Sequence, residues 1–336
     1  LFPRFSIQTR PRTLKIVFSN SKSRAGGKEF DTLVFSHFPP RFVNSAREMK
    51  TRWKADGKHG MLRAEKKGFF TMRIGILGGT FNPVHSAHVQ MARIARDEAA
   101  LDRVLLMVAA DPPHKRVEGE VPAAERLGLV RLALENEEKI FPSDLEIQRG
   151  GKSYTLYTLL ELQKRYPGAE LFLIVGSDTL GDLPNWHKPE EVLKIAGVLC
   201  VPRLGLDEND AAAAAALTAR YGARIQRLSG KVDRISSTQV REALESGEPV
   251  SGLLPEAVEQ AVYESGLYFP PDVRALQQKC RAALSAKRYT HTAGTMRAAA
   301  ALAKAWGQNA QSARTAALLH DCAKCLDPVT QEVLSG

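Results

Sequence analysis

From residue 73 onward, short apolar runs of strand length alternate with stretches whose apolar residues recur at helical spacing. The predicted strands cover residues 73–77, 103–109, 170–176, 197–202 and 224–228. The predicted helices cover residues 85–100, 122–135, 155–166, 188–196, 209–221 and 238–246. This alternation predicts an α/β domain in which helices cover a parallel sheet.

The pattern changes after Phe269-Pro270-Pro271, beyond which it is helical throughout. A Pro-Pro pair is a natural junction between domains, because proline interrupts helices and strands alike. We therefore divide this part of the chain into a domain over residues 72–270 and a smaller helical domain over residues 271–336. The alanine run at 211–216 is predicted to be helix rather than linker, since Ala has the highest helix propensity.

Residues 1–71 are a different kind of sequence. They carry 16 Lys and Arg against 5 Asp and Glu, which leaves 31 against 32 for residues 72–336. The net charge of +10 therefore belongs to this first segment. The segment also holds 9 of the 13 Phe residues, and we expect no strand or helix pattern in it.

Three interpretations of this basic segment are open. A basic arm could neutralise nucleic-acid phosphates or bind a membrane surface. Residues 1–28 are rich in basic residues and Ser and contain no acid, which is typical of a transit peptide. We favour the third, a disordered, non-native segment: Lys66-Lys67-Gly68 is what a purine-rich ribosome-binding site would give if translated, and Met72 would then be the initiator.

Composition excludes several classes of protein. No apolar run approaches the roughly 20 residues that a membrane helix needs. The four cysteines are too few and too scattered for a secreted disulfide framework. We expect a soluble, cytoplasmic protein without a membrane partner. The charge balance after residue 71 argues against nucleic acid as a partner, and the sequence leaves a homo-oligomer open.

The first candidate site is the motif G-G-T-F-N-P-V-H-S-A-H at residues 78–88. It joins the first predicted strand to the first predicted helix, where free backbone N–H groups and the helix dipole favour an anion. Gly78 and Gly79 let a phosphate approach the backbone, and His85 and His88 are spaced to share one face of the helix. Two imidazoles there can donate hydrogen bonds to a phosphate whose charge grows in a transition state.

A second motif, I-S-S-T-Q-V-R, follows at residues 235–241. A hydroxyl side chain at a helix start caps the helix, and its free N–H groups with Arg241 in the first turn suit a polyphosphate. On its own, the pattern would also fit an ordinary capped helix. It gains weight from standing in the same domain as the glycine and histidine motif.

Together the two motifs resemble those of the H-x-G-H nucleotidyltransferase superfamily, and in particular the nicotinate mononucleotide adenylyltransferases. The resemblance covers residues 72–269 and implies a Rossmann-like parallel-sheet domain in which His85, His88 and Arg241 act on the reacting phosphates. It also implies that ATP is bound by Gly78, Gly79, Thr80, Phe81, Ser236, Ser237 and Thr238. Two positions depart from the family motif, since Asn82 stands for its usual Asp and Ala87 for the Gly between the histidines.

Further segments match the acceptor site of the same family: P-P-H-K at 112–115, S-Y-T at 153–155, G-S-D at 176–178 and W-H-K at 186–188. By this resemblance Lys115 would attend the acceptor phosphate and Asp178 would hold the ribose. The backbone around Tyr154 and Thr155 would receive the nicotinate carboxylate, and Trp186 would stack on the pyridine ring. The implied reaction, in NAD biosynthesis, transfers the adenylyl group of Mg²⁺-bound ATP to nicotinate mononucleotide and releases pyrophosphate.

The helical end of the chain carries a second resemblance. R-Y-T-H-T at 288–292 and H-D-C-A-K at 320–324 are similar to the beginning of an HD-domain phosphohydrolase of the diadenosine tetraphosphate hydrolase group. This implies a partial, all-helical HD domain over residues 271–336. His291, His320 and Asp321 could then meet across two packed helices and bind Fe or Mn, as an incomplete HD ligand set.

Two alternatives to the nicotinate enzyme stay open at this point. Within the same fold, an adenylyltransferase or cytidylyltransferase could use another phosphorylated acceptor, such as phosphopantetheine. Outside catalysis, the chain could be a nucleic-acid-binding or regulatory protein, with the basic first segment as its footprint. The presence of both phosphate motifs favours the enzyme.

Overall fold

The computed structural model describes residues 71–112, 121–204, 210–322 and 324, together with the backbone of three strands within residues 4–36. The chain forms two compact units, Leu1–Phe69 and Phe70–Gly336. In the first unit, β1, β2 and β3 make an antiparallel sheet in that order. Their bounds are Arg4–Arg10, Thr13–Ser19 and Asp31–Ser36.

The expectation of no strand pattern in the basic segment is therefore wrong for these three strands. The sequences of β1 and β2 carry an alternation of apolar and polar residues that is typical of a half-buried strand, as in Leu14, Ile16 and Phe18 of β2. In β3 the consecutive apolar residues Leu33, Val34 and Phe35 break this period of two, which weakens the strand signal of the segment. Whether the segment is native protein stays a prediction.

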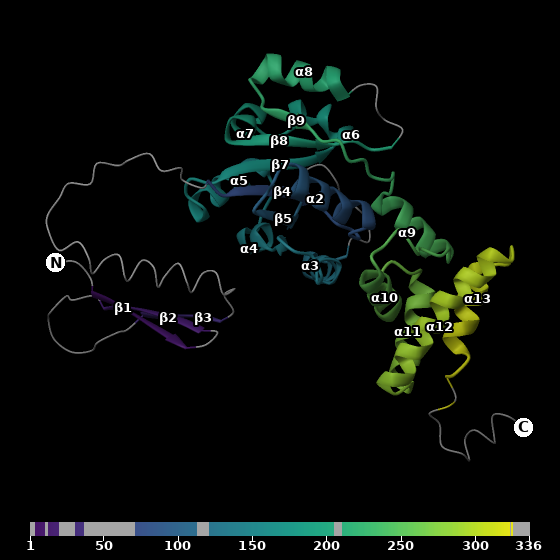
Figure 1. Ribbon diagram of the computed structural model, residues 1–336. Helices are drawn as coiled ribbons and strands as arrows, with labels where there is room; N and C mark the ends of the chain where they lie inside the picture. Colours follow the sequence, from purple (N-terminus) through teal and green to yellow (C-terminus); the bar gives the residue numbers. More distant parts are fainter. Residues whose placement is uncertain are drawn as a thin grey trace, which may run out of the picture. The chain divides into compact units, whose positions relative to one another are not determined.

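The second unit is built on a six-stranded parallel sheet with the order β6-β5-β4-β7-β8-β9 (Figure 1). The strands are β4 (Arg73–Gly79), β5 (Arg103–Val108), β6 (Ile140–Ser143), β7 (Glu170–Gly176), β8 (Ala196–Val201) and β9 (Ile225–Arg227). From β4 the chain adds β5 and then β6 on one side of the sheet, and it then adds β7, β8 and β9 on the other side. This is the doubly wound Rossmann order, whose ligands bind at the carboxyl ends of the strands where the direction reverses.

Alternate residues of each strand face two separate apolar cores. On β4 and β5, Leu77, Val104 and Leu106 belong to one core, whereas Ile76 and Leu105 belong to the other. The first core is covered by α2 (Ser86–Glu98), α3 (Ala123–Ala133), α9 (Ser237–Ser246) and α10 (Glu256–Ser265). The second is covered by α4 (Leu145–Arg149), α5 (Thr155–Arg165), α6 (Ser177–Leu180), the 3-10 helix η1 (Leu183–Asn185), α7 (Pro189–Ile195) and α8 (Asp210–Tyr221).

The predicted elements are confirmed within a few residues, including the helix over the alanine run. Five elements of the sheet domain were missed: the edge strand β6, the short helices α4, α6 and η1, and the ten-residue helix α10. Strand β6 has four residues and contains Pro142, so it carries neither the length nor the composition of a strand signal. Only its pairing with β5 makes it a strand.

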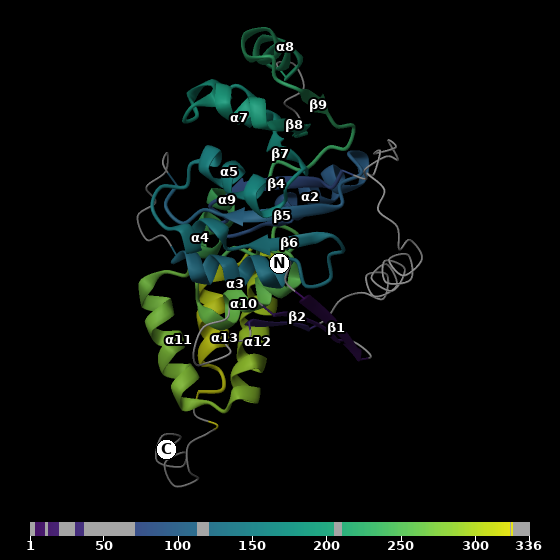
Figure 2. The same ribbon diagram turned by 90° about the vertical axis from the view of Figure 1, so that its left-hand side faces the viewer.

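Beyond Pro270 the described part of the chain is helical, as predicted, and forms α11 (Pro271–Ala283), α12 (Ala286–Ala305) and α13 (Ala310–Leu319). They pack against one another and against α10 (Figures 1 and 2). Their buried residues Val273, Met296 and Leu318 join the first core of the sheet domain. Among the helices that the structure describes, none has the length and apolar character needed to cross a membrane.

Candidate active site

A cavity of about 340 Å³ opens at the carboxyl ends of β4, β5 and β7. This is the point at which the strand order reverses, and the volume is that of a small-molecule site. Residues from segments far apart in the sequence meet there, among them Gly78, Gly79, Thr80, His88, Tyr154, Thr155 and Trp186. The structure thus brings the glycine motif and part of the predicted acceptor site to one place.

The two glycines at the end of β4 play different parts. A Cβ atom on Gly78 would meet nothing within 4 Å, so a side chain there would extend into the cavity that Gly78 lines. A Cβ atom on Gly79 would lie 3.1 Å from the ring of Phe81. That ring is 2% exposed and packs edge-on against His88, with ring centroids 4.9 Å apart. Phe81 therefore supports His88 and could reach a nucleotide only through its backbone.

The two histidines at the start of α2 form a stacked pair. Their ring centroids are 3.6 Å apart and their planes differ by 23°. The backbone N–H of His85 donates to Nδ1 of His88 at 3.2 Å. Because Nδ1 of His88 accepts this bond, the neutral ring carries its proton on Nε2 and can donate it to a ligand in the cavity. The spacing of three residues was sufficient to predict that both rings share one face.

Both imidazoles are held in the neutral form. Burial, with a smaller contribution from Arg203, lowers the pKa of His85 from 6.5 to about 3. Burial also holds the pKa of His88 well below 6.5, with His85 and Arg203 adding to the shift. A bound polyphosphate would favour the protonated forms, because an opposite charge close to a titratable group stabilises its charged state. The pair is therefore suited to donate to an anion whose charge grows.

The second motif is tied to the first by hydrogen bonds across more than 150 residues of sequence. Ser236 caps α9 by accepting from the N–H of Gln239 at 3.1 Å. Ser237 Oγ donates to the carbonyl of Pro83 at 2.8 Å, and Arg241 Nη1 donates to the carbonyl of Asn82 at 2.8 Å. Arg241 also reaches Thr238 Oγ1 at 3.2 Å. These contacts bring the amino end of α9 beside the loop that precedes α2, as a shared phosphate site requires.

The predicted acceptor end lies at the amino terminus of α5, where first-turn N–H groups have no partner within the helix. Tyr154 precedes this helix and Trp186 lines the cavity near it. His187 packs against the ring of Tyr154, with centroids 4.4 Å apart. Ser153 holds the segment to the end of β5, because its Oγ accepts from the N–H of Ala110 at 2.9 Å. Lys115, the predicted phosphate ligand, lies outside the described residues.

Asp178 occupies a different position from the other predicted acceptor residues. It is exposed at the edge of the site, and its Oδ1 lies 3.3 Å from Nε of Arg203. A Cβ atom on Gly176 would lie 2.4 Å from Oδ1 of Asp178 and 3.0 Å from Nε of Arg203, so glycine is required there for this ion pair to form. Arg203 itself lines the cavity.

Arg203 is the most important site residue that no sequence motif identified. It stands two residues after the end of β8, in V-P-R, so a position near a strand end was the signal that could have found it. Glu146 of α4 and Thr158 of α5 were also missed: both are buried, both line the cavity, and the Thr158 hydroxyl bonds to the Glu146 carboxylate. Arg126 is likewise buried and donates to the Thr80 carbonyl, which fixes the glycine loop in place.

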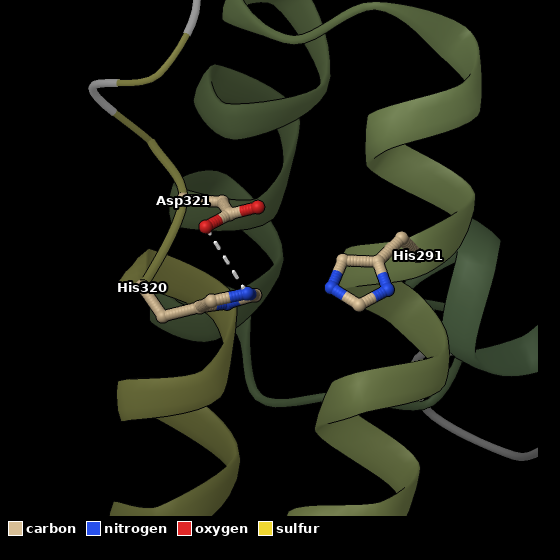
Figure 3. A group of neighbouring side chains, drawn as sticks. All are labelled: His291, His320 and Asp321. Carbon is tan, nitrogen blue, oxygen red and sulfur yellow. Dashed lines mark ion pairs between the residues drawn. The ribbon is translucent and has the colours of Figure 1, made fainter.

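A second candidate site lies in the helical region. His291 of α12 faces His320 and Asp321 at the end of α13 (Figure 3). One ligand atom from each of the three residues lies within 4.8 Å of the others. This is the convergence across two packed helices that the sequence predicted. The donor set of two imidazoles and a carboxylate suits Fe, Mn or a similar divalent ion.

Hydrogen bonding orients this set. Nδ1 of His320 lies 2.7 Å from the carbonyl of Ala317, so Nδ1 donates and the lone pair of Nε2 faces Asp321 at 3.3 Å. Lys324 Nζ lies 2.6 Å from Oδ1 of Asp321, and its hydrogen bond lowers the pKa of that carboxyl. Both residues at the end of α13 can thus offer a lone pair to a cation.

Comparisons with known proteins identify the same two regions of the chain. The cytidylyltransferase-like family matches residues 76–243, and the HD domain family matches residues 288–334. A probable nicotinate-nucleotide adenylyltransferase of Citrifermentans bemidjiense is 41% identical in an alignment of 212 residues that covers 59% of this chain and 98% of the relative. One of Gloeobacter violaceus is 42% identical over 200 residues, covering 59% of this chain and 97% of the relative.

Among solved structures, the nicotinic acid mononucleotide adenylyltransferase of Plasmodium falciparum matches 59% of this chain and 97% of its own, with 15% identity and a TM-score of 0.48. The curated relatives are matched over nearly their whole length at about 40% identity. The glycine loop, the histidine pair and the cap of α9 all lie within the part that the cytidylyltransferase-like family matches. The chain therefore belongs to the nicotinate-nucleotide adenylyltransferase family, and it carries an HD domain in addition.

Proposed function

We propose that residues 72–270 transfer the adenylyl group of ATP to nicotinate mononucleotide, giving nicotinate adenine dinucleotide and pyrophosphate. One observation carries the proposal above the others. The cavity at the switch point is lined both by His88 and the glycine loop and by Tyr154, Thr155 and Trp186. A phosphate-binding end and an aromatic end with free N–H groups are what a reaction between ATP and a pyridine nucleotide requires.

The chemistry is a displacement at phosphorus without a covalent enzyme intermediate. An oxygen of the acceptor 5′-phosphate attacks the α-phosphorus of ATP, a new P–O bond forms, and the bond to the β-phosphate bridging oxygen breaks as pyrophosphate leaves. His88 donates through Nε2 to the α-phosphate, and His85 stacks on His88 and keeps the ring in place. The protein therefore contributes positioning and electrostatic stabilisation.

The remaining phosphates would be bound by the two helix starts. The N–H groups after Gly78 and Gly79 and those at the start of α9 would bind the triphosphate. Arg241, which bonds to Thr238 Oγ1 at 3.2 Å, would add a positive charge beside them. Mg²⁺ bound with ATP would offset charge on the triphosphate and assist the departure of pyrophosphate. Arg203, close enough to the histidines to lower their pKa values, would bring further positive charge to the same phosphates.

The acceptor would lie at the other end of the cavity. The N–H groups around Thr155 would receive the nicotinate carboxylate, and Trp186 would stack on the ring. Lys115 would bind the acceptor phosphate. Asp178, which forms an ion pair with Arg203, would hold the ribose.

The decisive experiment supplies the full chain with ATP, Mg²⁺ and one acceptor at a time, and measures pyrophosphate release. We expect nicotinate mononucleotide to react with a kcat/KM about 10-fold or more above that of nicotinamide mononucleotide, because a hydrogen bond to a charged group is stronger than one to an amide. Equal values would contradict the carboxylate site at Thr155. Turnover of phosphopantetheine instead would support the alternative acceptor, and no turnover at all would support a non-catalytic role.

We propose separately that His291, His320 and Asp321 bind Fe or Mn. The supporting observation is their convergence within 4.8 Å together with the orientation of His320 by Ala317. Metal analysis after loading with Fe²⁺ or Mn²⁺ tests this. One ion per chain that is lost in His320→Ala would support the site, and no metal above background would refute it.

A further inference from the structure

The helical region is joined to the adenylyltransferase domain by one continuous core. Val258 and Val262 of α10 belong to the same apolar cluster as Val273, Met296 and Leu318 of α11, α12 and α13. In both views of the molecule α10 lies next to these helices (Figures 1 and 2). The helical region therefore covers one end of the domain and is in direct contact with it.

Each helix of this region supplies one side chain to the carboxyl end of α9 or α10. Gln277 of α11 donates to the carbonyl of Tyr263, and the Tyr289 hydroxyl of α12 donates to the carbonyl of Glu264 at 2.6 Å. Arg314 of α13 donates through Nη1 to the carbonyl of Leu244 at 2.6 Å. Carbonyl groups in the last turn of a helix have no partner within the helix, and a cation there also complements the helix dipole. Three carbonyls at these helix ends thus accept a bond from the helical region, and that of Leu244 also accepts from the N–H of Gly247 at 3.4 Å.

Arg314 differs from the other two because it is a charge in the apolar core. Its side chain is 0% exposed, and its Cζ lies 4.3 Å from the centroid of the Phe269 ring. Nε and Nη2 have no hydrogen-bond partner among the described residues. Burial is costly for a guanidinium with so few partners, and it lowers the pKa of Arg314. The hydrogen bond to the Leu244 carbonyl, at the negative end of the α9 dipole, is the strong contact that remains. Because Arg314 is fully buried, water cannot replace this bond.

The backbones of α9 and α13 also meet at this point. Gly247, which ends α9 with a φ of 81°, leaves no room for a side chain, since a Cβ atom there would lie 2.6 Å from Cα of Gln311. The end of α9 is thus seated directly against the first turn of α13. Its position is set by this contact and by Arg314.

The other end of α9 carries the second phosphate motif. Arg241 and Leu244 are three residues apart, hence neighbours on one face of a helix that is about 15 Å long. A shift or tilt of α9 at Leu244 would move Arg241 and Ser237 away from the carbonyls of Asn82 and Pro83. Arg241 and Leu244 lie within one turn of α9, so the position of its carboxyl end constrains the position of the motif.

We propose that Arg314 of the HD region is a positioning residue for ATP binding by the adenylyltransferase domain. It acts through α9, whose motif it holds against the Asn82–Pro83 loop. The proposal rests on the proposed function in one respect, that α9 binds ATP. It makes the HD region a working part of the transferase site, in addition to any metal that the region binds.

The test compares two single substitutions in the full chain. Arg314→Met keeps the length of the side chain and removes the bond to α9, whereas Tyr289→Phe removes the equivalent bond to α10, which carries none of the phosphate-motif residues. We expect Arg314→Met to weaken binding of a non-hydrolysable ATP analogue, and to raise the KM for ATP, by about fivefold. The KM for the acceptor should change by less than about twofold. Arg314→Lys, which keeps a donor, should restore most of the affinity.

Tyr289→Phe should lower the thermal midpoint without changing ATP affinity. If Arg314→Met only lowered the thermal midpoint in the same way, Arg314 would be structural and the proposal would be overturned. Analogue binding is measured without an acceptor, so a failure of this inference is distinguishable from a failure of adenylyl transfer.

A measurement on the unaltered chain covers the case in which Arg314→Met does not fold. Coupling is reciprocal, so an ATP analogue that fixes α9 must also stabilise the contacts of α13. Hydrogen exchange of the amides in Ala310–Leu319 should slow when the analogue binds, along with those of Ser237–Ser246. Slower exchange in α9 with no change in α13 would overturn the proposal.

Discussion

The two histidine pairs of this chain show how the same residue type is adapted to opposite charges. His85 and His88 are stacked at the start of α2, where His85 is buried, half-buried His88 packs against Phe81, and both are kept neutral beside Arg203. His291 and His320 are exposed, with ring centroids 5.6 Å apart, and they share Asp321 between two helices. The first pair has cationic neighbours and suits an anion, whereas the second has a carboxylate and suits a metal ion.

The difference lies in what surrounds the imidazoles. A lone pair directed at a cation requires that the other ring nitrogen donate, as Nδ1 of His320 does to Ala317. A donor directed at an anion requires that the other nitrogen accept, as Nδ1 of His88 does from the backbone of His85. One backbone group beside each ring thus determines which chemistry that ring can perform.

The largest expected difference between the two histidine sites is in the effect of a substitution on adenylyl transfer. His88→Ala should lower kcat for adenylyl transfer by about 100- to 1000-fold, because its donor is directed at charge that develops in the transition state. The KM values should change far less. In His291→Ala, turnover should fall by less than about twofold. A large rise in KM with unchanged kcat in His88→Ala would show that His88 only binds substrate.

The converse experiment measures metal affinity. His320→Ala removes a ligand of the proposed metal site, and we expect the affinity for Fe²⁺ or Mn²⁺ to fall by more than the roughly 10- to 100-fold that is typical of losing an outer partner. His88→Ala should bind the metal as the unaltered chain does. Isothermal titration of both variants would measure this, and equal metal affinity in His320→Ala would place the ion elsewhere.

The burial of His85 should also make the free energy of unfolding depend on pH. The pKa of His85 is about 3 in the folded chain and near 6.5 when unfolded, so the unfolded state binds the extra proton between these values. The contribution to stability is fully present above pH 6.5 and is lost as the pH falls toward 3. At about pH 5 the loss amounts to about 2 kcal/mol in the free energy of unfolding.

Urea unfolding of the unaltered chain and of His85→Gln at about pH 7 and about pH 5 checks this value. The loss between the two pH values should be smaller in His85→Gln by about that amount, because the other titrating groups are common to both chains. Identical losses would show that His85 is already accessible to protons in the folded state.

The smallest effect is expected from the first 71 residues, which lie outside both histidine pairs. A chain beginning at Met72 should keep the kcat and the thermal midpoint of its sheet domain, because residues 70–336 form a compact unit of their own. Activity assays and thermal unfolding of the two chains would measure the difference. A large loss of either quantity would show that the basic segment packs on the enzyme.

Much of the site could be predicted because its signals are local. The glycines, the two histidines and the cap of α9 each occupy a few consecutive residues, and the period of the apolar positions placed them at strand ends and helix starts. Glu146 and Arg126 carried no such signal, and Arg203 had only its position just after a strand end. Each gains its role from a partner on another element or loop, such as the Thr80 carbonyl that Arg126 reaches.

The sequence by itself determined the alternation of strands and helices, the change to helices alone after Pro270 and the residue types of both histidine sites. These follow from hydrophobic periodicity and from backbone chemistry, which act over a few residues. Only the tertiary structure decided the protonation of His85 and His88 and the seating of α13 against Gly247. Burial and interhelical contact depend on segments that meet only in the folded chain, and so does the electric field at a buried ring.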